Sequence, residues 1–364
     1  MLDRLDDIDW TQHQHAYGSA ADVPDLLRAL ASTKKKKRDA AWHDLHGNVW
    51  HQGTVWEVTP LVVPFLIELV AEKSVAEKHA LLNYLARLAG NGNLEADPED
   101  AHGLATRDAV TEGFFEFTPF LESDEVTERI AASFLLGQLP NRAKDVVAAL
   151  RTVVERGGDE RVVASACFSL AQVAPRDLKV AGLLRQATEG DAHSLPRVAA
   201  AMALVCYVET GPVPLSVVRA LVAALEKPGP LEKSYADLPW RSSRLDLDVC
   251  GIVKRLDREL APHFVPALLV MLEREKTPYT ATIPVGALLH FVFGEPDWKN
   301  FEARKQKRRP PGKLTAEQRR LLEVFLAKDM WITPSGAGNG NLGALLNPLE
   351  LPTTRQELES YLGS

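Results

Sequence analysis

The feature that most constrains this chain is an internal repeat with a period of 34 residues. An alanine recurs at that interval, and a leucine four positions later does the same: Ala132, Ala166 and Ala200, with Leu136, Leu170 and Leu204. Residues four apart lie on one face of a helix, and a small residue on that face lets neighbouring helices approach closely. A repeat of this length accommodates two helices, and glycine and proline occur where those helices would have to end. The repeat therefore predicts an all-α fold, an α-solenoid of stacked antiparallel helix pairs with a period of about 34 residues.

The composition favours the same fold class. Aromatic residues make up only 7% of the chain, while hydrophobic residues reach 46% and include much Ala, Leu and Val. Val, Ile and Thr do not alternate with polar residues over a useful length, so the sequence predicts no strand. The formal net charge of −7 argues against a general nucleic-acid binder.

Interruptions of the period divide the 364 residues into four regions. The predicted order is an N-terminal cap over 1–60, a repeat array over 61–300, a basic Pro-rich linker over 301–313 and a C-terminal helical cap over 314–364. Two insertions interrupt the array, near 91–112 and near 228–248, and we expect the first to be a flexible solvated loop. Ser74 to Glu77 and Thr315 to Gln318 have the pattern of capping boxes, which predicts helix starts at both places.

The repeats resemble HEAT repeats of the short-period kind, also called phycobilisome-lyase-like. The resemblance is strong over about 117–225 and looser over 60–90 and 240–295. His51-Gln52-Gly53-Thr54 and the segment after Pro310 are also similar to bacterial HEAT-like proteins. The resemblance implies an α-solenoid but no particular reaction, because such repeats serve in scaffolds, inhibitors, lyases and glycosylases alike.

Tryptophan and histidine are concentrated between residues 42 and 56. The candidate partner-binding residues in this segment are Trp42, His46, Trp50, His51 and Trp56. The alternative is a purely structural cap that covers the apolar face of the first repeat. A metal site that includes His43 is less favoured, because regularly spaced carboxylate or cysteine ligands are missing.

A second candidate surface follows Pro228-Gly229-Pro230. Tyr235, Trp240 and Arg241 belong to residue types that are enriched at interface hot spots. The alternative is that Trp240 packs down and closes the interruption of the array. Together with the segment 42–56, these residues form the candidate partner-binding set.

Positive charge is concentrated in two short blocks. The first is Lys34, Lys35, Lys36, Lys37 and Arg38, and the second runs from Arg304 to Arg309 and includes Lys307, Arg308 and Arg309. Without these ten cations the rest of the chain carries about −17, so two basic segments accompany an acidic body. The blocks are the candidate nucleic-acid contacts in an alternative function, which includes a DNA-glycosylase-like one. Neither block contains aromatic residues, so stacking on bases is unsupported.

Catalytic signatures are missing from the sequence. It contains no Gly-x-Ser-x-Gly, no His-Glu-x-x-His and no dinucleotide-binding fingerprint. Cys167, Cys206 and Cys250 are far apart, which excludes a disulfide framework or a cysteine zinc site, and we expect Cys167 and Cys206 to be core residues. We therefore expect a protein that is not an enzyme and needs no cofactor or metal.

The predicted function is a protein-binding scaffold. An acidic body suits a basic protein partner, and the sharper form of this hypothesis is an immunity-type inhibitor of a basic toxin. The acidic N-terminus lacks an apolar segment of the kind found in signal peptides, and no run of residues is a good membrane span. We therefore expect a cytoplasmic protein without a membrane partner.

Overall fold

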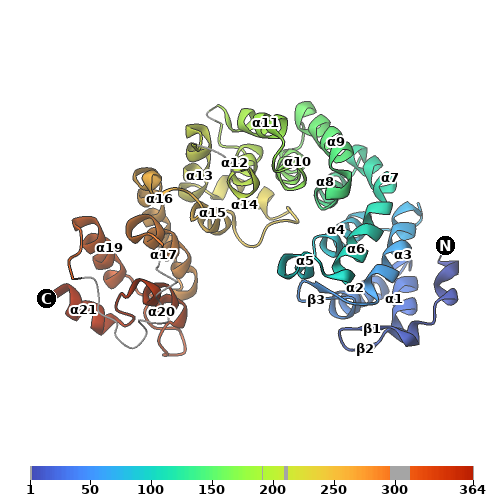
Figure 1. Cartoon of the computed structure of the whole chain (residues 1–364), viewed down its shortest axis with the longest axis horizontal. Helices are drawn as coiled ribbons and strands as arrows, with labels where there is room; N and C mark the ends of the chain where they lie inside the picture. The colour runs from blue at the N-terminus through green and yellow to red at the C-terminus, as the bar shows by residue number, and fades with distance from the viewer. Residues whose placement is uncertain (1, 191, 209–211, 296–311, 364) are drawn as a thin grey trace. The chain divides into compact units, whose positions relative to one another are not determined.

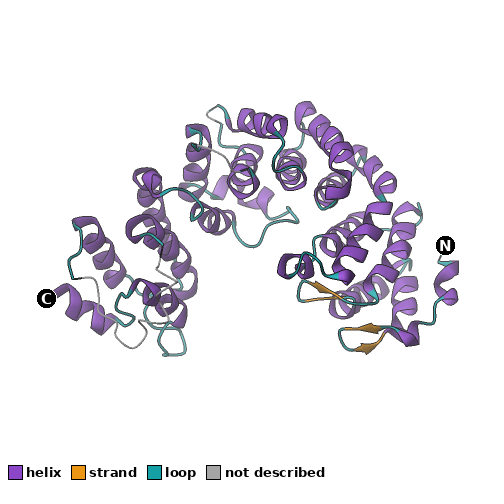
Figure 2. Cartoon of the chain, in the orientation of Figure 1, coloured by secondary structure: helices purple, strands orange, loops and turns teal. Residues whose placement is uncertain are grey.

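The computed structural model describes residues 2–190, 192–208, 212–295 and 312–363. Within these residues nearly all regular structure is helical, which confirms the predicted all-α fold class (Figures 1 and 2). The chain forms two compact units. Unit 1 contains Met1–Ala187, Tyr207–Glu209 and Asp237–Trp240, and unit 2 contains Thr188–Cys206, Thr210–Ala236 and Arg241–Ser364. The division between the units falls inside the array predicted for 61–300.

Unit 1 consists of α-helices, short 3-10 helices and two small hairpins. Its α-helices are α1 (Val23–Leu30), α2 (Lys35–Asn48), α3 (Thr59–Ala71), α4 (Lys78–Ala89), α5 (Gly92–Ala96), α6 (Ala101–Glu112), α7 (Phe114–Phe117), α8 (Val126–Gly137), α9 (Ala143–Arg156), α10 (Glu160–Val173) and α11 (Leu178–Thr188). Its 3-10 helices are η1 (Asp3–Asp7), η2 (Trp10–Gln12), η3 (Ala20–Asp22), η4 (Thr118–Glu122) and η5 (Pro140–Arg142).

The helices of unit 1 pack as successive pairs. The second helices α4, α8 and α10 lie side by side, in that order, while α3 packs on α4 and α9 packs on α10 (Figure 1). The repeated positions Ala132, Ala166, Leu136 and Leu170 are fully buried. The 34-residue pattern therefore reports the apolar contacts that hold consecutive pairs together.

The insertion near 91–112 is helical, so the predicted flexible loop is wrong. Asn91 Oδ1 accepts a hydrogen bond from the Leu94 backbone N–H at 3.3 Å and begins α5, and Asp100 Oδ2 accepts one from the Gly103 N–H at 2.5 Å and begins α6. α6 packs against α3 and α4. Asn91 and Asp100 are thus helix caps. Gly, Asn and Asp are common both at helix caps and in loops, so their number alone does not distinguish the two.

Two short hairpins occur where the sequence predicts no strand. β1 (Gln14–His15) pairs with β2 (Gly18–Ser19), and β3 (Trp50–His51) pairs with β4 (Thr54–Val55) (Figure 2). The second hairpin turns at Gln52 and Gly53, which have positive φ of 51° and 92°. Strands of two residues are too short to show alternation, and only the turn residues could have indicated them.

The helix starts predicted from capping boxes have different outcomes. The box at Thr315 and Gln318 forms. The one at Ser74 does not, because α4 begins at Lys78 after Glu77 in the left-handed conformation. The Lys78 ammonium donates to the carbonyls of Leu69, Val70 and Glu72 at the end of α3. A cation there satisfies the orphan carbonyls of the preceding helix and opposes its dipole.

Unit 2 continues the pattern of packed helices. They are α12 (Leu195–Tyr207), α13 (Leu215–Glu226), α14 (Gly229–Tyr235), α15 (Leu245–Val253), α16 (Ala261–Arg274), α17 (Pro278–Phe293), α19 (Ala316–Ala327), α20 (Gly340–Leu346) and α21 (Arg355–Gly363), with 3-10 helices η6 (Arg258–Leu260) and η7 (Asn347–Leu349). α13 packs on α15 and α16, α17 packs on α15 and α16, and α17 also contacts α19 and α20. The last residue of α11 belongs to unit 2, and that of α12 to unit 1.

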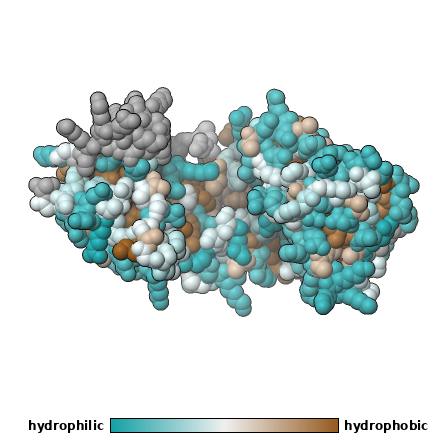
Figure 3. All heavy atoms as spheres, turned by 90° about the horizontal axis from the view of Figure 1, so that it is seen from below, coloured by the Kyte–Doolittle hydropathy of each residue, from teal (hydrophilic) through white to brown (hydrophobic). Residues whose placement is uncertain are grey.

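Figure 3 shows apolar residues in small patches between hydrophilic ones on the face in view. Among the described residues, no helix combines the length and the apolar character that crossing a bilayer requires.

Candidate protein-binding site

The second helices of unit 1, α4, α8 and α10, pack side by side and carry the repeated positions of the sequence. We define the α4–α8–α10 face by Arg87 on α4, Phe134 and Gln138 on α8, and Phe168 and Gln172 on α10, of which Gln138 and Phe168 are largely buried. Phe134 and Phe168 are 34 residues apart, as are Gln138 and Gln172. The two glutamines hydrogen-bond reciprocally, each Nε2 donating to the other Oε1, at 2.9 and 3.2 Å. The repeat thus places equivalent side chains next to one another.

An aromatic cluster borders this face at α4. The His46 ring lies 6.0 Å from Trp42, 5.7 Å from Trp50 and 4.6 Å from Tyr84, measured between ring centroids. Residues 42 and 46 are one helical turn apart on α2, and Trp50 follows in β3. Desolvation among these rings, followed by the Arg87 charge, lowers the pKa of His46.

Trp50 joins the cluster to the α4–α8–α10 face. The Arg87 guanidinium lies over the Trp50 ring at 5.6 Å from its centroid. The indole is half-buried, and its N–H is buried without a hydrogen-bond partner among the described residues. Tryptophan with a stacked arginine is a common combination at interface hot spots.

Trp240 borders the same face at α10. Its ring stacks on Phe168 at 4.1 Å with an interplanar angle of 2°, and Phe168 also meets Tyr207 edge-on at 5.4 Å. The segment 237–240 is held there by Arg161, whose Nη1 donates to Asp237 at 2.8 Å. Hydrogen bonds to Asp159 and Asp237 raise the pKa of Arg161 further. Trp240 therefore both covers α10 and leaves a half-buried indole at the surface.

The remaining predicted contact residues have other positions. Tyr235 is 0% exposed, and its hydroxyl donates to Asp248 at 2.6 Å, so it has no surface for a partner in this conformation. Burial and the Asp248 carboxylate raise its pKa. Arg241 is exposed and donates to the Ala236 carbonyl at 2.7 Å. His51 packs against Tyr17 at 5.2 Å, apart from the His46 cluster, and Trp56 is 36% exposed.

The first basic block starts a helix and is partly neutralised. Lys35 to Arg38 form the first turn of α2. Arg38 is buried and donates to Glu77 at 2.8 Å, and Lys35 pairs with Asp39 at 2.7 Å. Lys34, Lys36 and Lys37 are exposed. The other candidate nucleic-acid contacts, Lys307, Arg308 and Arg309, lie outside the described residues.

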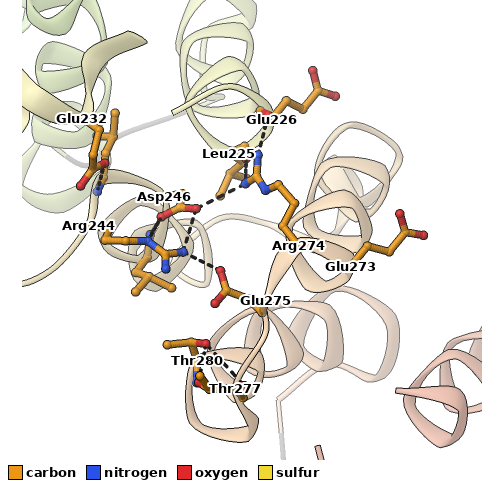
Figure 4. Close-up of polar contacts among 12 residues, drawn as sticks. Leu225, Glu226, Glu232, Arg244, Asp246, Glu273, Arg274, Glu275, Thr277 and Thr280 are labelled. Carbon is orange, nitrogen blue, oxygen red and sulfur yellow. Dashed lines mark hydrogen bonds and ion pairs between the residues drawn. The ribbon is translucent and has the colours of Figure 1, made fainter. Parts of the chain in front are cut away.

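Unit 2 contains a charged pocket that the sequence does not indicate. It has a volume of about 620 Å³ and equal numbers of acidic and basic lining residues. Figure 4 shows its central side chains, Arg244, Asp246, Arg274 and Glu275, pointing toward one another. Arg244 donates to Asp246 at 3.1 and 3.2 Å and to Glu275 at 2.5 Å, and Arg274 donates to Asp246 at 3.3 Å.

This network compensates two buried carboxylates. Asp246 is 3% and Glu275 6% exposed. Burial raises the pKa of Glu275, but hydrogen bonds from Thr280 and Arg244 and the charges of both arginines outweigh it, so the pKa is lowered. Arg274 also donates to the Leu225 and Glu226 carbonyls at the end of α13. The network therefore joins α13, α15 and the turn between α16 and α17. Only Asp246 and Asp248 stand out in the sequence, as a carboxylate pair on one short segment.

Reactive groups are scarce in the described part of the chain. Burial raises the pKa of Cys167 and Cys250 to about 12, and that of Cys206 to a lesser extent. No three described His, Cys, Asp or Glu side chains are grouped as metal ligands.

Comparison of the sequence with protein-family models and with curated proteins found no match. The resemblance to HEAT repeats stays a prediction from the repeat itself.

Proposed function

We propose that the chain is a non-enzymatic scaffold that binds another protein on the α4–α8–α10 face. The observation that carries the proposal is the position of two half-buried tryptophans, Trp50 against α4 and Trp240 against α10, with α8 between these helices. Each is held by neighbouring side chains before a partner arrives, so binding orders few new groups.

The chemistry of the face suits a protein partner. Large, rigid aromatic side chains bury much area at a low cost in conformational entropy, and glutamine and arginine supply polar contacts around them. The face consists of helices that need no rearrangement to present these groups. A repeat frame with period-breaking segments on one face is a common basis of protein recognition.

The sharper form of the proposal is an immunity-type inhibitor that covers the active site of a basic toxin in the bacterial cytoplasm. The net charge of −7 supports a basic partner. Exposed Glu95, Asp97 and Glu99 lie on the insertion that begins next to Gly90, which contacts Gln138. Complementary charge would speed association more than it would tighten the final complex.

The proposal is tested by quantitative affinity purification with a tagged chain. We expect one basic protein to be enriched by the wild-type chain and lost with Trp50→Ala or Trp240→Ala. Tyr279→Ala removes a half-exposed aromatic residue of unit 2 and serves as the matched control. Far-UV circular dichroism establishes that each variant is folded.

Binding of the enriched partner is then measured with purified proteins. Loss of affinity by roughly a factor of 30 or more for either tryptophan variant is expected of a hot spot. Equal affinity of the folded variants and the wild type contradicts the proposal. Binding of duplex DNA that weakens steeply with salt concentration would favour the nucleic-acid alternative instead, if it also disappears when the charges of Lys36 and Lys37 are reversed by substitution with glutamate.

A further inference from the structure

The Gln138–Gln172 pair is held in a fixed geometry. A Cβ atom placed on Gly90 would lie 2.3 Å from Gln138 Oε1, so the amide lies directly against Gly90. Gln138 is 7% exposed, and its Nε2 and Oε1 are both bonded to Gln172. The two carboxamides are therefore oriented in the unbound chain.

Each carboxamide keeps unused hydrogen-bonding capacity. An amide side chain offers two donors and two acceptor lone pairs, and the reciprocal pair uses one of each per residue. Both glutamines line a pocket of about 240 Å³ together with Gly90, Asn91, Leu94, Glu95, Pro98 and Arg107. One free N–H and one free carbonyl lone pair per glutamine complement the main chain of an extended peptide, which offers the same two groups.

The charges around this pocket select the kind of peptide. Glu95, Asp97 and Glu99 are exposed and have no ion-pair partner among the described residues. Arg107 is half-buried and donates its Nε–H to the Ala89 carbonyl at 3.0 Å, which holds it against α4. Glu95 lines the pocket opposite in charge to Arg107, and Asp97 and Glu99 flank the lining residue Pro98 in the sequence. Solvated carboxylates favour lysine and arginine on a ligand and repel acidic residues.

We propose that the α4–α8–α10 face binds an extended, basic peptide segment of the partner, whose main chain bonds to the Gln138–Gln172 pair while its basic side chains lie beside Glu95, Asp97 and Glu99. This inference rests on the proposed function and deepens it, since it names the kind of segment that is recognised. Recognition of main-chain groups gives affinity, and the three carboxylates give specificity.

The test uses the full chain and a phage-displayed library of random peptides. We expect the selected peptides to be enriched in lysine and arginine and depleted in glutamate and aspartate. The best one, synthesised with a fluorescent label, is titrated with the wild type, with Glu95→Gln and with Glu116→Gln, an exposed glutamate on α7. Only Glu95→Gln should weaken binding, by roughly three- to tenfold.

The main-chain contact is tested first on the peptide and then on the protein. N-methylation of the central peptide groups removes their donors, and we expect it to weaken binding at least about tenfold. Gln138→Leu combined with Gln172→Leu should have the same effect, while the exposed Gln356→Leu should not. Selection of acidic or purely apolar peptides, or equal binding of the N-methylated peptide, overturns the inference.

The two proposals fail in distinguishable ways. If the partner protein binds through Trp50 and Trp240 but its affinity is unchanged in the glutamine variant and no basic peptide competes, the peptide inference is wrong and the binding scaffold stands. If basic peptides bind through the glutamine pair while no protein depends on either tryptophan, the peptide inference stands and the function proposed for the tryptophans is wrong.

Discussion

Gly137 on α8 lies directly against Ser169 on α10. A Cβ atom on Gly137 would lie 2.6 Å from Ser169 Cβ and 2.9 Å from Ser169 Cα. Real carbon atoms do not approach so closely, so the helix axes would have to separate. The two residues differ by 32 positions, close to the period of the repeat, and the glycine lets consecutive helix pairs pack at this spacing.

We therefore expect Gly137→Ala to destabilise unit 1. Overpacking of a tight helix contact costs roughly 1–3 kcal/mol of unfolding free energy. The matched control is Gly182→Ala on α11, where an added Cβ meets nothing within 4 Å. That change should be neutral or stabilise the unit by roughly 0.5–1 kcal/mol, because alanine favours the helix. Urea unfolding of both variants measures the difference, and equal stabilities would show that the α8–α10 contact can expand freely.

Arg197 is expected to be a stabilising residue. It is buried, and it donates to the Thr188 carbonyl, at the end of α11, at 2.9 Å and to the Ala192 carbonyl at 3.1 Å. Arg197→Ala leaves these carbonyls without their donor and should cost about 2–3 kcal/mol. Arg219→Ala, on the exposed side of α13, should change the unfolding free energy by less than about 0.5 kcal/mol. Thermal unfolding of the two variants provides the comparison. Similar losses of unfolding free energy in both would contradict a capping role for Arg197.

The sequence predicts the fold class because the relevant signal is local and repeated. Ala132 and Leu136 lie on one helical face and recur 34 residues later, so their burial follows from periodicity alone. The failed capping box at Ser74 shows the limit of such reasoning. Its motif is present, but α4 begins at Lys78, whose ammonium donates to carbonyls at the end of α3, a contact that a local motif does not contain.

The candidate site is only partly predictable, because some of its contacts join segments that are distant in the sequence. Trp42, His46 and Trp50 are close in sequence at helical spacing, and they do form one cluster. Tyr235 and Trp240 have similar hot-spot character in the sequence, yet one is buried and the other is half-buried on Phe168, 72 positions away. Residue type predicts the ability to bind, whereas exposure depends on contacts between distant segments.

Glu275 should make the stability of unit 2 depend on pH in the acidic range. Its folded pKa lies below its unfolded value, so its contribution is present above the unfolded pKa and is lost as pH falls through the folded pKa. Glu275→Gln should destabilise the unit near pH 7 by roughly 1–3 kcal/mol, and the difference from wild type should shrink below about pH 4. Glu273→Gln, an exposed neighbour on α16, is the control. A difference that stays constant with pH, measured by urea unfolding, would contradict the ion-pair account.

The cysteines should resist alkylation in the native chain. Burial raises the pKa of Cys167 and Cys250 to about 12, so almost no thiolate exists at pH 8. Cys206 is half-buried and should react first, although more slowly than a free thiol. Iodoacetamide labelling followed by mass spectrometry gives the order, and denaturant should make all three react. Rapid labelling of Cys167 in the folded chain would reveal local opening of α10.

The Trp240–Phe168 stack is expected to couple the segment 237–240 to α10. Parallel rings 4.1 Å apart should show a coupling free energy of about 0.5–1.5 kcal/mol in a double-mutant cycle. The four proteins are the wild type, Trp240→Ala, Phe168→Ala and the double variant, compared by urea unfolding. Asp237→Asn should reduce the coupling, because it removes the charged acceptor that Arg161 uses to hold the segment. A coupling free energy indistinguishable from zero would mean that Trp240 does not stack on Phe168 in solution. Trp240 would then not border the proposed binding face at α10.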